Sequence, residues 1–445
     1  MPRSTLLGPV VPSHRTLLAT ASGFRLLRPL RERRFALLWS GLTISLLGDG
    51  LYTVAIAWTA YELSGAPTAL TLVGLAAAIP QLVLVLVGGV LSDRFERRRV
   101  MLVADTVRAL VVALIGVLAL AHVLRLWHLV ALVGVYGIGT ALFAPAITAL
   151  VPELVPEEHL LEANALNQVS RPIMLRFVGP ALGGVLIAKT GVGWAFVADA
   201  LSFCASLAAL VAIGRRVAPA TARRVRPSIL RDVGEGFAYA RSQPWLLGTL
   251  VGTSLAMFFF YGPVYVLLPF VVKHVLGGSA RDLGAVFAAG GIGAILVSLT
   301  LGGRGLPRRP LTVMYAAWMV MALQLVGYAT AGSLWEVVAA SFGGTALLVC
   351  GQILWSTMLQ RRVPLQLLGR VASLDSLLSY ALVPLSYAVT APVEAAIGVR
   401  ATLIGAGLAS ATTLALTLAF FPNLRAVEES DASELGPQHG TAGAG

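Results

Sequence analysis

Residues 69–99 read ALTLVGLAAAIPQLVLVLVGGVLSDRFERRR, an apolar run that ends in a cluster of charged side chains. The part from 69 to 91 contains no charged residue. A helix needs about 20 apolar residues to cross about 30 Å of hydrocarbon, so this run is long enough to span a membrane. The stretch therefore predicts a transmembrane helix whose charged end emerges at one membrane surface.

The composition extends this prediction to the whole chain of 445 residues. Hydrophobic residues make up 57% of it and charged residues only 12%, and the mean hydropathy is +0.83. A soluble protein of this size needs more charge to cover its surface. The 46 glycines and 23 prolines are tolerated in a membrane, where glycine lets helices approach closely. We therefore expect an all-α integral membrane protein.

Hydrophobic runs of similar length recur along the chain. Twelve of them are expected to form transmembrane helices, at residues 36–60, 69–91, 100–121, 127–150, 165–188, 194–213, 246–272, 283–302, 311–330, 335–358, 371–395 and 400–421. A short internal repeat, Val155-Pro156 before span five and Val363-Pro364 before span eleven, divides them into two halves. Two pseudo-symmetric bundles of six helices are a transporter design.

The placement of arginine and lysine predicts the orientation in the membrane. With the N-terminus inside, most basic residues fall in the cytoplasmic loops at 91–99, 214–245, 303–310 and 359–370. This asymmetry follows the positive-inside rule. We therefore expect both termini in the cytoplasm and the protein in the plasma or inner membrane. Topology also explains the net charge of +12, so no nucleic-acid partner is expected.

The expected organisation has five parts. They are a basic cytoplasmic segment at 1–34, an N-terminal six-helix bundle at 35–213, a cytoplasmic linker at 214–245, a C-terminal six-helix bundle at 246–421 and a disordered cytoplasmic tail at 422–445. In the linker, Ile229, Val233, Phe237 and Tyr239 are spaced like one face of a short helix. This spacing predicts an amphipathic helix at the membrane surface.

The loop after the second span carries the most specific motif. Gly88 to Arg99 contains a glycine, then an aspartate–arginine pair, then a basic cluster, and it lies on the expected cytoplasmic side. This pattern resembles the signature loop of the major facilitator superfamily. The matching residues are Gly89, Asp93, Arg94, Arg97 and Arg98, while Glu96 stands where the pattern usually has glycine. Basic loops also follow cytoplasmic helix ends for topology alone, but the glycine-to-aspartate spacing favours the family.

The resemblance implies a conformational latch between the two halves on the cytoplasmic side. Asp93 would accept hydrogen bonds from the free backbone amides at the start of span eleven, near Gly369 and Arg370. Arg94 and Arg97 would complete the charge network. The corresponding loop of the second half, 302–309, lacks the aspartate.

Span five contains a second motif, Gly179-Pro180-Ala181-Leu182-Gly183-Gly184. It resembles the glycine–proline signature of the exporter branches of the superfamily, although Leu175 replaces an earlier glycine of that pattern. Small residues there permit close packing and a local bend, and plain packing is the alternative use. Residues 45–50, 164–167 and 199–203 also resemble the exporter group that contains macrolide efflux proteins and the enterobactin exporter.

Ionisable residues inside the spans are costly unless they are paired or hydrated, so each needs a reason. Asp49 and Arg176 lie at similar depths in spans one and five, which are neighbours in this fold. We expect them to approach each other or to share a water-filled cavity, with Asp49 as a proton carrier. A static structural ion pair is the alternative.

Spans three and six also carry charged residues. Asp105 and Arg108, three residues apart in span three, predict a local ion pair. Asp199 lies near the expected outer end of span six, where capping or water contact suffices.

A substrate cavity is expected around the aromatic residues of span seven. The residues proposed for its wall are Tyr261, Tyr265, Gln352, Trp355 and Tyr380. Aromatic rings beside a Gly-Pro break offer stacking and hydroxyl contacts to an amphipathic molecule. For each residue taken alone, lipid contact or packing is the alternative.

The expected function is secondary active export of a small amphipathic molecule, such as a drug, an antibiotic or a secondary metabolite, by proton antiport with alternating access. The alternatives are a siderophore or lipid transporter, or an importer, of the same fold. A membrane receptor or scaffold that transports nothing is a third possible class of function. The sequence has no nucleotide-binding P-loop and no H-E-x-x-H motif, so we expect neither an enzyme nor a cofactor or metal. The expected partners are the substrate, protons and the bilayer, with the chain acting as a monomer.

Overall fold

A computed structural model of the chain describes residues 27–94, 96–214, 229–304 and 307–420. Within these ranges the chain is helical and contains no strand. The elements of the first half are η1 (Arg28–Arg31), α2 (Arg33–Ser64), α3 (Pro67–Arg94), α4 (Arg97–Leu120), α5 (Leu126–Leu154), η2 (Glu157–His159), α6 (Leu160–Arg171), η3 (Pro172–Val178), α7 (Gly179–Thr190) and α8 (Val192–Ile213). The second half comprises α9 (Ile229–Ser242), α10 (Pro244–Gly262), η5 (Pro263–Leu267), α11 (Leu268–Phe270), η6 (Val271–Val275), α12 (Ala280–Arg304), α13 (Pro310–Ala322), α14 (Gln324–Thr330), α15 (Leu334–Arg362), α16 (Leu365–Ala381) and α17 (Val383–Phe420).

Eleven helical segments of the described chain are long and apolar enough to cross a membrane. The first ten fall on the first ten expected spans. The last, Leu367–Phe420, has 54 residues and would measure about 80 Å if it were one continuous helix. It is interrupted at Gly398, whose φ of 81° and ψ of 162° are not helical and suit glycine. The all-α membrane fold is therefore confirmed, and the count of twelve stays a prediction that depends on this break.

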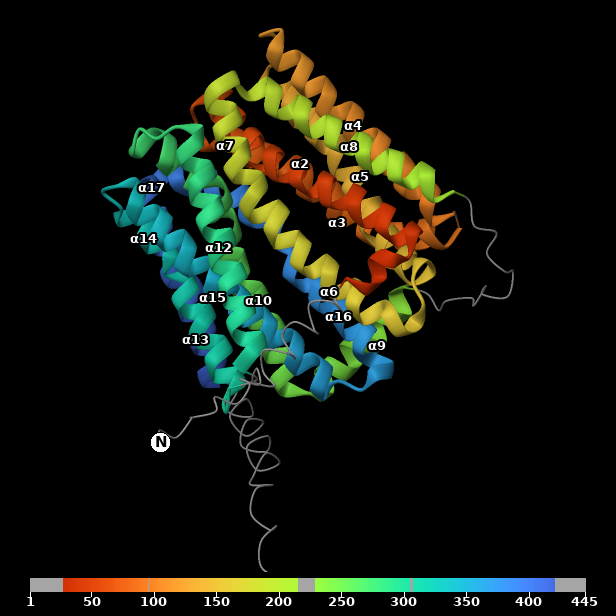
Figure 1. Cartoon of the computed structure of the whole chain (residues 1–445). Coiled ribbons are helices and arrows are strands. Elements are labelled where there is room, and N and C mark those ends of the chain that lie inside the picture. The colour runs from red at the N-terminus through yellow and green to blue at the C-terminus, as the bar shows by residue number, and fades with distance from the viewer. Residues whose placement is uncertain (1–26, 95, 215–228, 305–306, 421–445) are drawn as a thin grey trace, which may run out of the picture.

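The helices of the first half pack around α2. Helix α2 lies along α8, α3 packs on α5, and α4 packs on both α5 and α8 (Figure 1). Small residues make the α2–α8 contact close: a Cβ on Gly41 would lie 2.7 Å from the Cβ of Ala209. Such small-residue contacts let membrane helices associate through van der Waals packing.

The helices of the second half form a comparable group. Helix α12 packs on α15, α10 on α17, and α13 on both α15 and α17 (Figure 1). Here too a glycine allows close approach, because a Cβ on Gly290 of α12 would lie 2.7 Å from the Thr345 hydroxyl of α15.

The two groups meet where η3 and α7 pack against α12, and where α3 packs against α17. Gly184 of α7 faces α12 so closely that its Cβ would lie 2.7 Å from the carbonyl oxygen of Ala280. On the other side, a Cβ on Gly74 of α3 would lie 3.1 Å from the ring of Tyr387. Under the expected topology, these contacts fall in the outer halves of the helices.

Part of the expected linker between the two halves is described, and it contains helix α9. Helix α9 packs against α16, where Glu235 forms an ion pair with Arg370. The Tyr239 hydroxyl donates to the carbonyl oxygen of Arg362 at 3.4 Å, and burial raises the pKa of the Tyr239 phenol. The rest of the linker, residues 1–26 and residues 421–445 lie outside the described residues.

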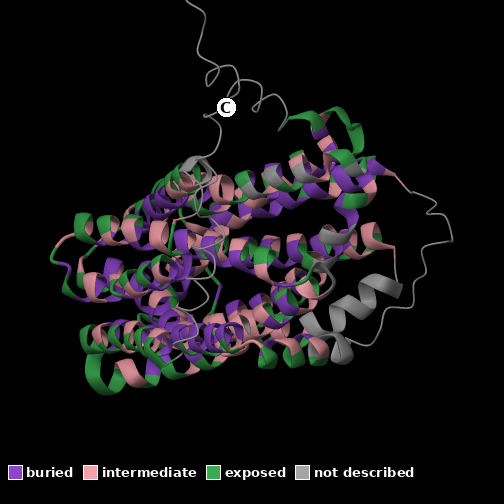
Figure 2. Ribbon diagram, turned by 90° about the horizontal axis from the view of Figure 1, so that it is seen from below, coloured by how far each residue is buried: buried purple, intermediate pink, exposed green. Residues whose placement is uncertain are grey.

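The outward faces of the helices are apolar. Figure 2 shows exposed positions along the outside of the bundle and buried positions inside it. Leucines such as Leu110 (65% exposed) and Leu299 (69% exposed) point outward, as expected for helices in lipid. The exposed tryptophans Trp127, Trp194 and Trp335 all lie within the first residues of α5, α8 and α15. Under the expected topology these three helices start at the outer surface, where tryptophan is favoured at the membrane–water boundary.

Candidate substrate and proton pathway

Asp49 lies in the middle of α2, the helix around which the first half is built. The Tyr136 hydroxyl of α5 donates a hydrogen bond to Asp49 Oδ1 at 2.7 Å. The Tyr136 ring stacks on Tyr52, with ring centroids 4.8 Å apart, which holds the hydroxyl in place. Tyr136 therefore fixes the orientation of the carboxyl group that the sequence singled out as a proton carrier.

A cavity of about 480 Å³ opens beside Asp49 within the first half of the chain. Its lining residues are Leu42, Thr43, Ser45, Leu46, Asp49, Arg108, Thr140, Phe143, Ala144, Ile147, Val151, Asn164, Asn167, Ser170, Arg171 and Leu175. The volume is within the usual range of small-molecule sites, which combine apolar walls with a few polar groups. The cavity runs from Asp49 toward the ends of α5 and α6 that are expected at the cytoplasmic side.

Arg108 is the buried cation of this region. It forms the expected ion pair with Asp105, and the Ser206 hydroxyl donates to Asp105 Oδ2 at 2.6 Å. The Arg108 guanidinium also lies 4.3 Å from the ring centre of Phe143, a cation–π contact. The local pair is thus observed, but Arg108 additionally lines the cavity beside Asp49.

The expected approach of Arg176 to Asp49 is not observed. Arg176 is exposed on the π-helix η3. Its backbone carbonyl oxygen faces Gly291 of α12. Among the described residues no ion pair joins Arg176 to Asp49, and Arg176 does not line the cavity. Arg176 points away from Asp49 because the wide π-helical turn of η3 rotates the side chains of span five relative to those of a regular α-helix. Arg108 takes the place expected of Arg176.

The burial of Asp199 was not expected, because the sequence indicated capping or water contact at a helix end. Its side chain is fully buried and accepts a hydrogen bond from Ser202 at 3.2 Å. Gly48 of α2 packs directly against this site. Asp199 is therefore an interior residue of the first half rather than a cap at a helix end.

The glycine–proline motif places α7 between two neighbours. A Cβ on Gly179 would lie 2.8 Å from the carbonyl oxygen of Leu47, and one on Gly183 would lie 3.0 Å from the Cα of Leu51, both in α2. Gly184 faces α12 in the other half. Pro180 follows η3 at the first turn of α7, a position that proline tolerates. The expected close packing is present, and the motif joins both halves.

The loop motif is described only in part. Arg97 at the start of α4 forms an ion pair with Glu153 of α5, and Arg98 Nε donates to the carbonyl oxygen of Leu210 at 2.5 Å. The side chains of Asp93 and Arg94 and the surroundings of Gly89 lie outside the described residues, so the latch contact stays a prediction. Gly369 has open space where a Cβ would stand.

The expected aromatic cavity wall does not line the cavity beside Asp49. Tyr261 and Tyr265 stack on each other, with ring centroids 5.6 Å apart. Trp355 Nε1 donates to Asp375 Oδ2 at 3.2 Å, a partner that the sequence did not indicate. Gln352 is exposed, and the side chain of Tyr380 lies outside the described residues.

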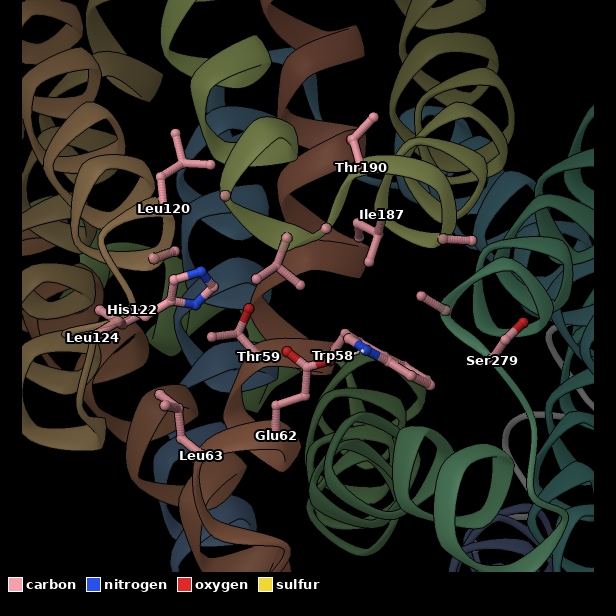
Figure 3. A pocket seen from close by; sticks show the side chains of 16 residues that line it. Trp58, Thr59, Glu62, Leu63, Leu120, His122, Leu124, Ile187, Thr190 and Ser279 are labelled. Atoms are coloured by element: carbon pink, nitrogen blue, oxygen red, sulfur yellow. Dashed lines mark hydrogen bonds between the residues drawn. The ribbon is translucent and has the colours of Figure 1, made fainter.

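A second cavity, of about 590 Å³, lies at the opposite end of α2. Trp58, Thr59 and Glu62 of α2 line it (Figure 3), and Trp58 Nε1 donates to Glu62 at 2.7 Å. The Lys273 ammonium of η6 lies 4.3 Å from the Trp58 ring centre. Together with the hydrogen bond from Tyr61 to the carbonyl oxygen of Val266, this contact joins the two halves at the expected outer side.

Comparison with known proteins decides the family. The family model described as transmembrane secretion effector matches residues 25–441. The chain belongs to the major facilitator superfamily. This transporter is 24% identical to macrolide efflux protein A of Streptococcus pyogenes over 82% of the chain and 91% of that protein. It is 28% identical to the multidrug efflux pump Tap of Mycolicibacterium fortuitum over 90% and 97%. It is also 30% identical to the enterobactin exporter EntS of Shigella boydii over 65% and 68%.

Solved structures show the same fold for this transporter. The nucleoside transporter NupG has a TM-score of 0.66 at 12% identity, covering 88% of this chain and 98% of that one. A bacterial homolog of the human lysosomal transporter Spinster has a TM-score of 0.62 at 15% identity, covering 91% and 98%. The family prediction is thus confirmed, and the protein is a multi-pass membrane transporter rather than an enzyme.

The polar interior of this transporter combines expected and unexpected residues. Asp49 was expected from its depth in span one, whereas Tyr136 carried no signal, since tyrosine in a membrane span is common. The arrangement combines a cavity of small-molecule size with a carboxyl group in its wall.

Proposed function

We propose that this transporter exports a small amphipathic molecule, such as a drug, an antibiotic or a secondary metabolite, in exchange for protons. The observation that carries the proposal is the carboxyl group of Asp49, which is half-buried in the middle of α2 and lies in the wall of the 480 Å³ cavity. The macrolide, multidrug and enterobactin exporters among the relatives support the outward direction and the substrate class.

The cavity suggests how the exchange proceeds. In the described conformation Asp49 faces a cavity on the proposed cytoplasmic side, where it releases a proton as the substrate enters. The hydrogen bond from Tyr136 stabilises the carboxylate that remains. When the cavity opens to the other side, the substrate leaves and Asp49 takes up a proton from outside. Because a buried unpaired charge is costly, the transporter changes conformation only when either the proton or the substrate is bound.

The contacts between the halves support an inward-facing assignment. Gly184 against Ala280 and Lys273 over Trp58 hold the halves together at the proposed outer side. The latch of Asp93 with Gly369 and Arg370 would act at the cytoplasmic side in the opposite conformation. Arg176, exposed beside α12, is proposed to assist coupling only when η3 and α12 move apart. Cytoplasmic termini and a monomeric working form complete the proposal.

A siderophore is the second candidate substrate. The observation that favours it is the identity of 30% to an enterobactin exporter. Export of a siderophore would require the same cavity and the same direction of transport, so the two candidates differ only in the ligand.

The experiment begins with a susceptibility panel on a deletion strain, which selects the compound. Purified protein in proteoliposomes is then tested with that radiolabelled compound under an imposed pH gradient. We expect Asp49→Asn to lose gradient-driven transport but to retain exchange of labelled for unlabelled compound. The reason is that an asparagine amide neither gains nor loses a proton near neutral pH. Glu336→Gln, an exposed acid at the start of α15, is the control. Gradient-driven transport at the wild-type rate in Asp49→Asn would exclude Asp49 as the carrier.

A further inference from the structure

The interior of the first half contains more acidic than basic side chains. Among the described residues, Asp49, Asp105 and Asp199 face this interior together with Arg108. Asp105 and Arg108 form an ion pair that is electrically neutral and is further satisfied by Ser206. Asp49 and Asp199 are therefore left without a full counter-charge of their own.

These two carboxyl groups are close in the fold. Asp49 follows Gly48, and Gly48 packs against the Asp199–Ser202 turn of α8, where its Cβ would lie 2.7 Å from the Cβ of Ser202. Asp49 and Asp199 consequently interact electrostatically. Two neighbouring carboxylates in a protein interior repel each other, which favours a proton on the more deeply buried one.

The surroundings of Asp199 are those of a neutral carboxyl group. It is fully buried, and its Oδ2 atom has no hydrogen-bonding partner among the described residues, nor has the nearby Tyr52 hydroxyl. The titratable groups facing it are Asp49 and Tyr52 from α2, Arg108 from α4 and Tyr136 from α5. On α7, the charged Lys189 lies in the last turn and is exposed. An ionised carboxylate in this position would leave one charged oxygen without a donor, which is costly.

We propose that Asp199 is a second proton-binding site of this transporter, protonated in the described conformation. The site deepens the proposed antiport and rests on it for its role in transport. If Asp199 releases its proton when α2 and α8 shift, the exchange carries two protons per cycle instead of one, and export of a neutral compound then moves two net charges per cycle across the membrane instead of one.

Infrared spectroscopy tests the protonation directly, because a protonated carboxyl and a carboxylate absorb at different frequencies. The protein is labelled with carbon-13 at the aspartate side-chain carboxyl, which separates aspartate from glutamate bands. The background is Asp49→Asn with Asp375→Asn, which removes the proposed carrier and the half-buried aspartate of α16. At neutral pH we expect a labelled protonated-carboxyl band that is lost on the further change Asp199→Asn. Asp282→Asn, a change at a helix cap, should leave it in place.

Absence of the labelled band before the Asp199→Asn change overturns the inference, as does a band that survives that change. The first outcome requires no Asp199 variant, so it holds even if that variant does not fold. The readout is also independent of transport. A band together with uncoupled transport rejects the antiport and keeps the second proton site, whereas coupled transport without the band rejects only Asp199.

Discussion

Gly184 offers the sharpest perturbation of the contact between the two halves. An alanine Cβ there would lie 2.7 Å from the carbonyl oxygen of Ala280, 3.0 Å from the Cα of Gly284 and 3.1 Å from the Cα of Arg281. All three atoms are backbone atoms of α12, so none can rotate away. Alanine at 184 therefore requires α7 and α12 to move apart.

The size of the effect follows from the cost of overpacking. Inserting a methyl group into a close-packed contact costs about 1–3 kcal/mol. This cost falls on the described conformation and is relieved in any conformation that separates α7 from α12. A difference of about 1–3 kcal/mol changes the ratio of two conformations roughly 5- to 150-fold. Gly184→Ala should raise the population open at the α7–α12 side by that factor, as long as this conformation is a minor one.

The assay uses a cysteine at Ile187, which is 5% exposed and lines the 590 Å³ cavity one turn from Gly184. Cys204 and Cys350 are first replaced by serine. A membrane-impermeant maleimide applied to whole cells should label Ile187→Cys faster in the Gly184→Ala background. Gly343→Ala is the matched control, because its Cβ meets no atom within 4 Å. Equal labelling rates in the Gly184→Ala, Gly343→Ala and wild-type backgrounds would refute the role of this contact.

Two further predictions concern the α2–α7 contact within the first half and the contact of Lys273 with Trp58 between the halves. Gly50→Ala places a methyl group 2.7 Å from the Cα of Gly179 and should lower the free energy of unfolding by about 1–3 kcal/mol. Thermal unfolding of the purified protein checks this against Gly405→Ala, whose Cβ has open space. Equal melting temperatures of the two variants would contradict the prediction. Trp58→Leu removes the cation–π contact of Lys273, which is worth about 0.5–1 kcal/mol. It should therefore speed the labelling of Ile187→Cys, but by a smaller factor than Gly184→Ala does. An unchanged labelling rate would show that this contact does not help to close the outer side.

The sequence predicts the membrane class and the first ten spans because the length of an apolar run is a property of consecutive residues. The last crossing depends on one glycine, Gly398, whose positive φ becomes visible only in the structure. The ion pair of Asp105 with Arg108 was equally accessible, because residues three apart in a helix are neighbours whatever the tertiary packing.

The partner of Asp49 was not predictable in the same way. Depth in the membrane can be counted along the chain, but the facing of Arg176 depends on the π-helical turn of η3, which shifts the helix phase. Asp199 was placed at a helix end by counting, whereas its burial results from the close approach of Gly48. The aromatic residues of span seven did attract a cavity prediction, yet the cavity beside Asp49 lies in the other half.

Reciprocal access to the two cavities tests alternating access most directly. Leu46→Cys reports on the cavity beside Asp49, and Ile187→Cys reports on the cavity at the other end of α2. Labelling rates of both are measured in right-side-out and inside-out vesicles, with and without Gly184→Ala. The account predicts that Gly184→Ala makes Ile187→Cys more reactive from outside and Leu46→Cys less reactive from inside. A simultaneous rise at both positions would mean that the halves loosen without alternating, and would contradict it.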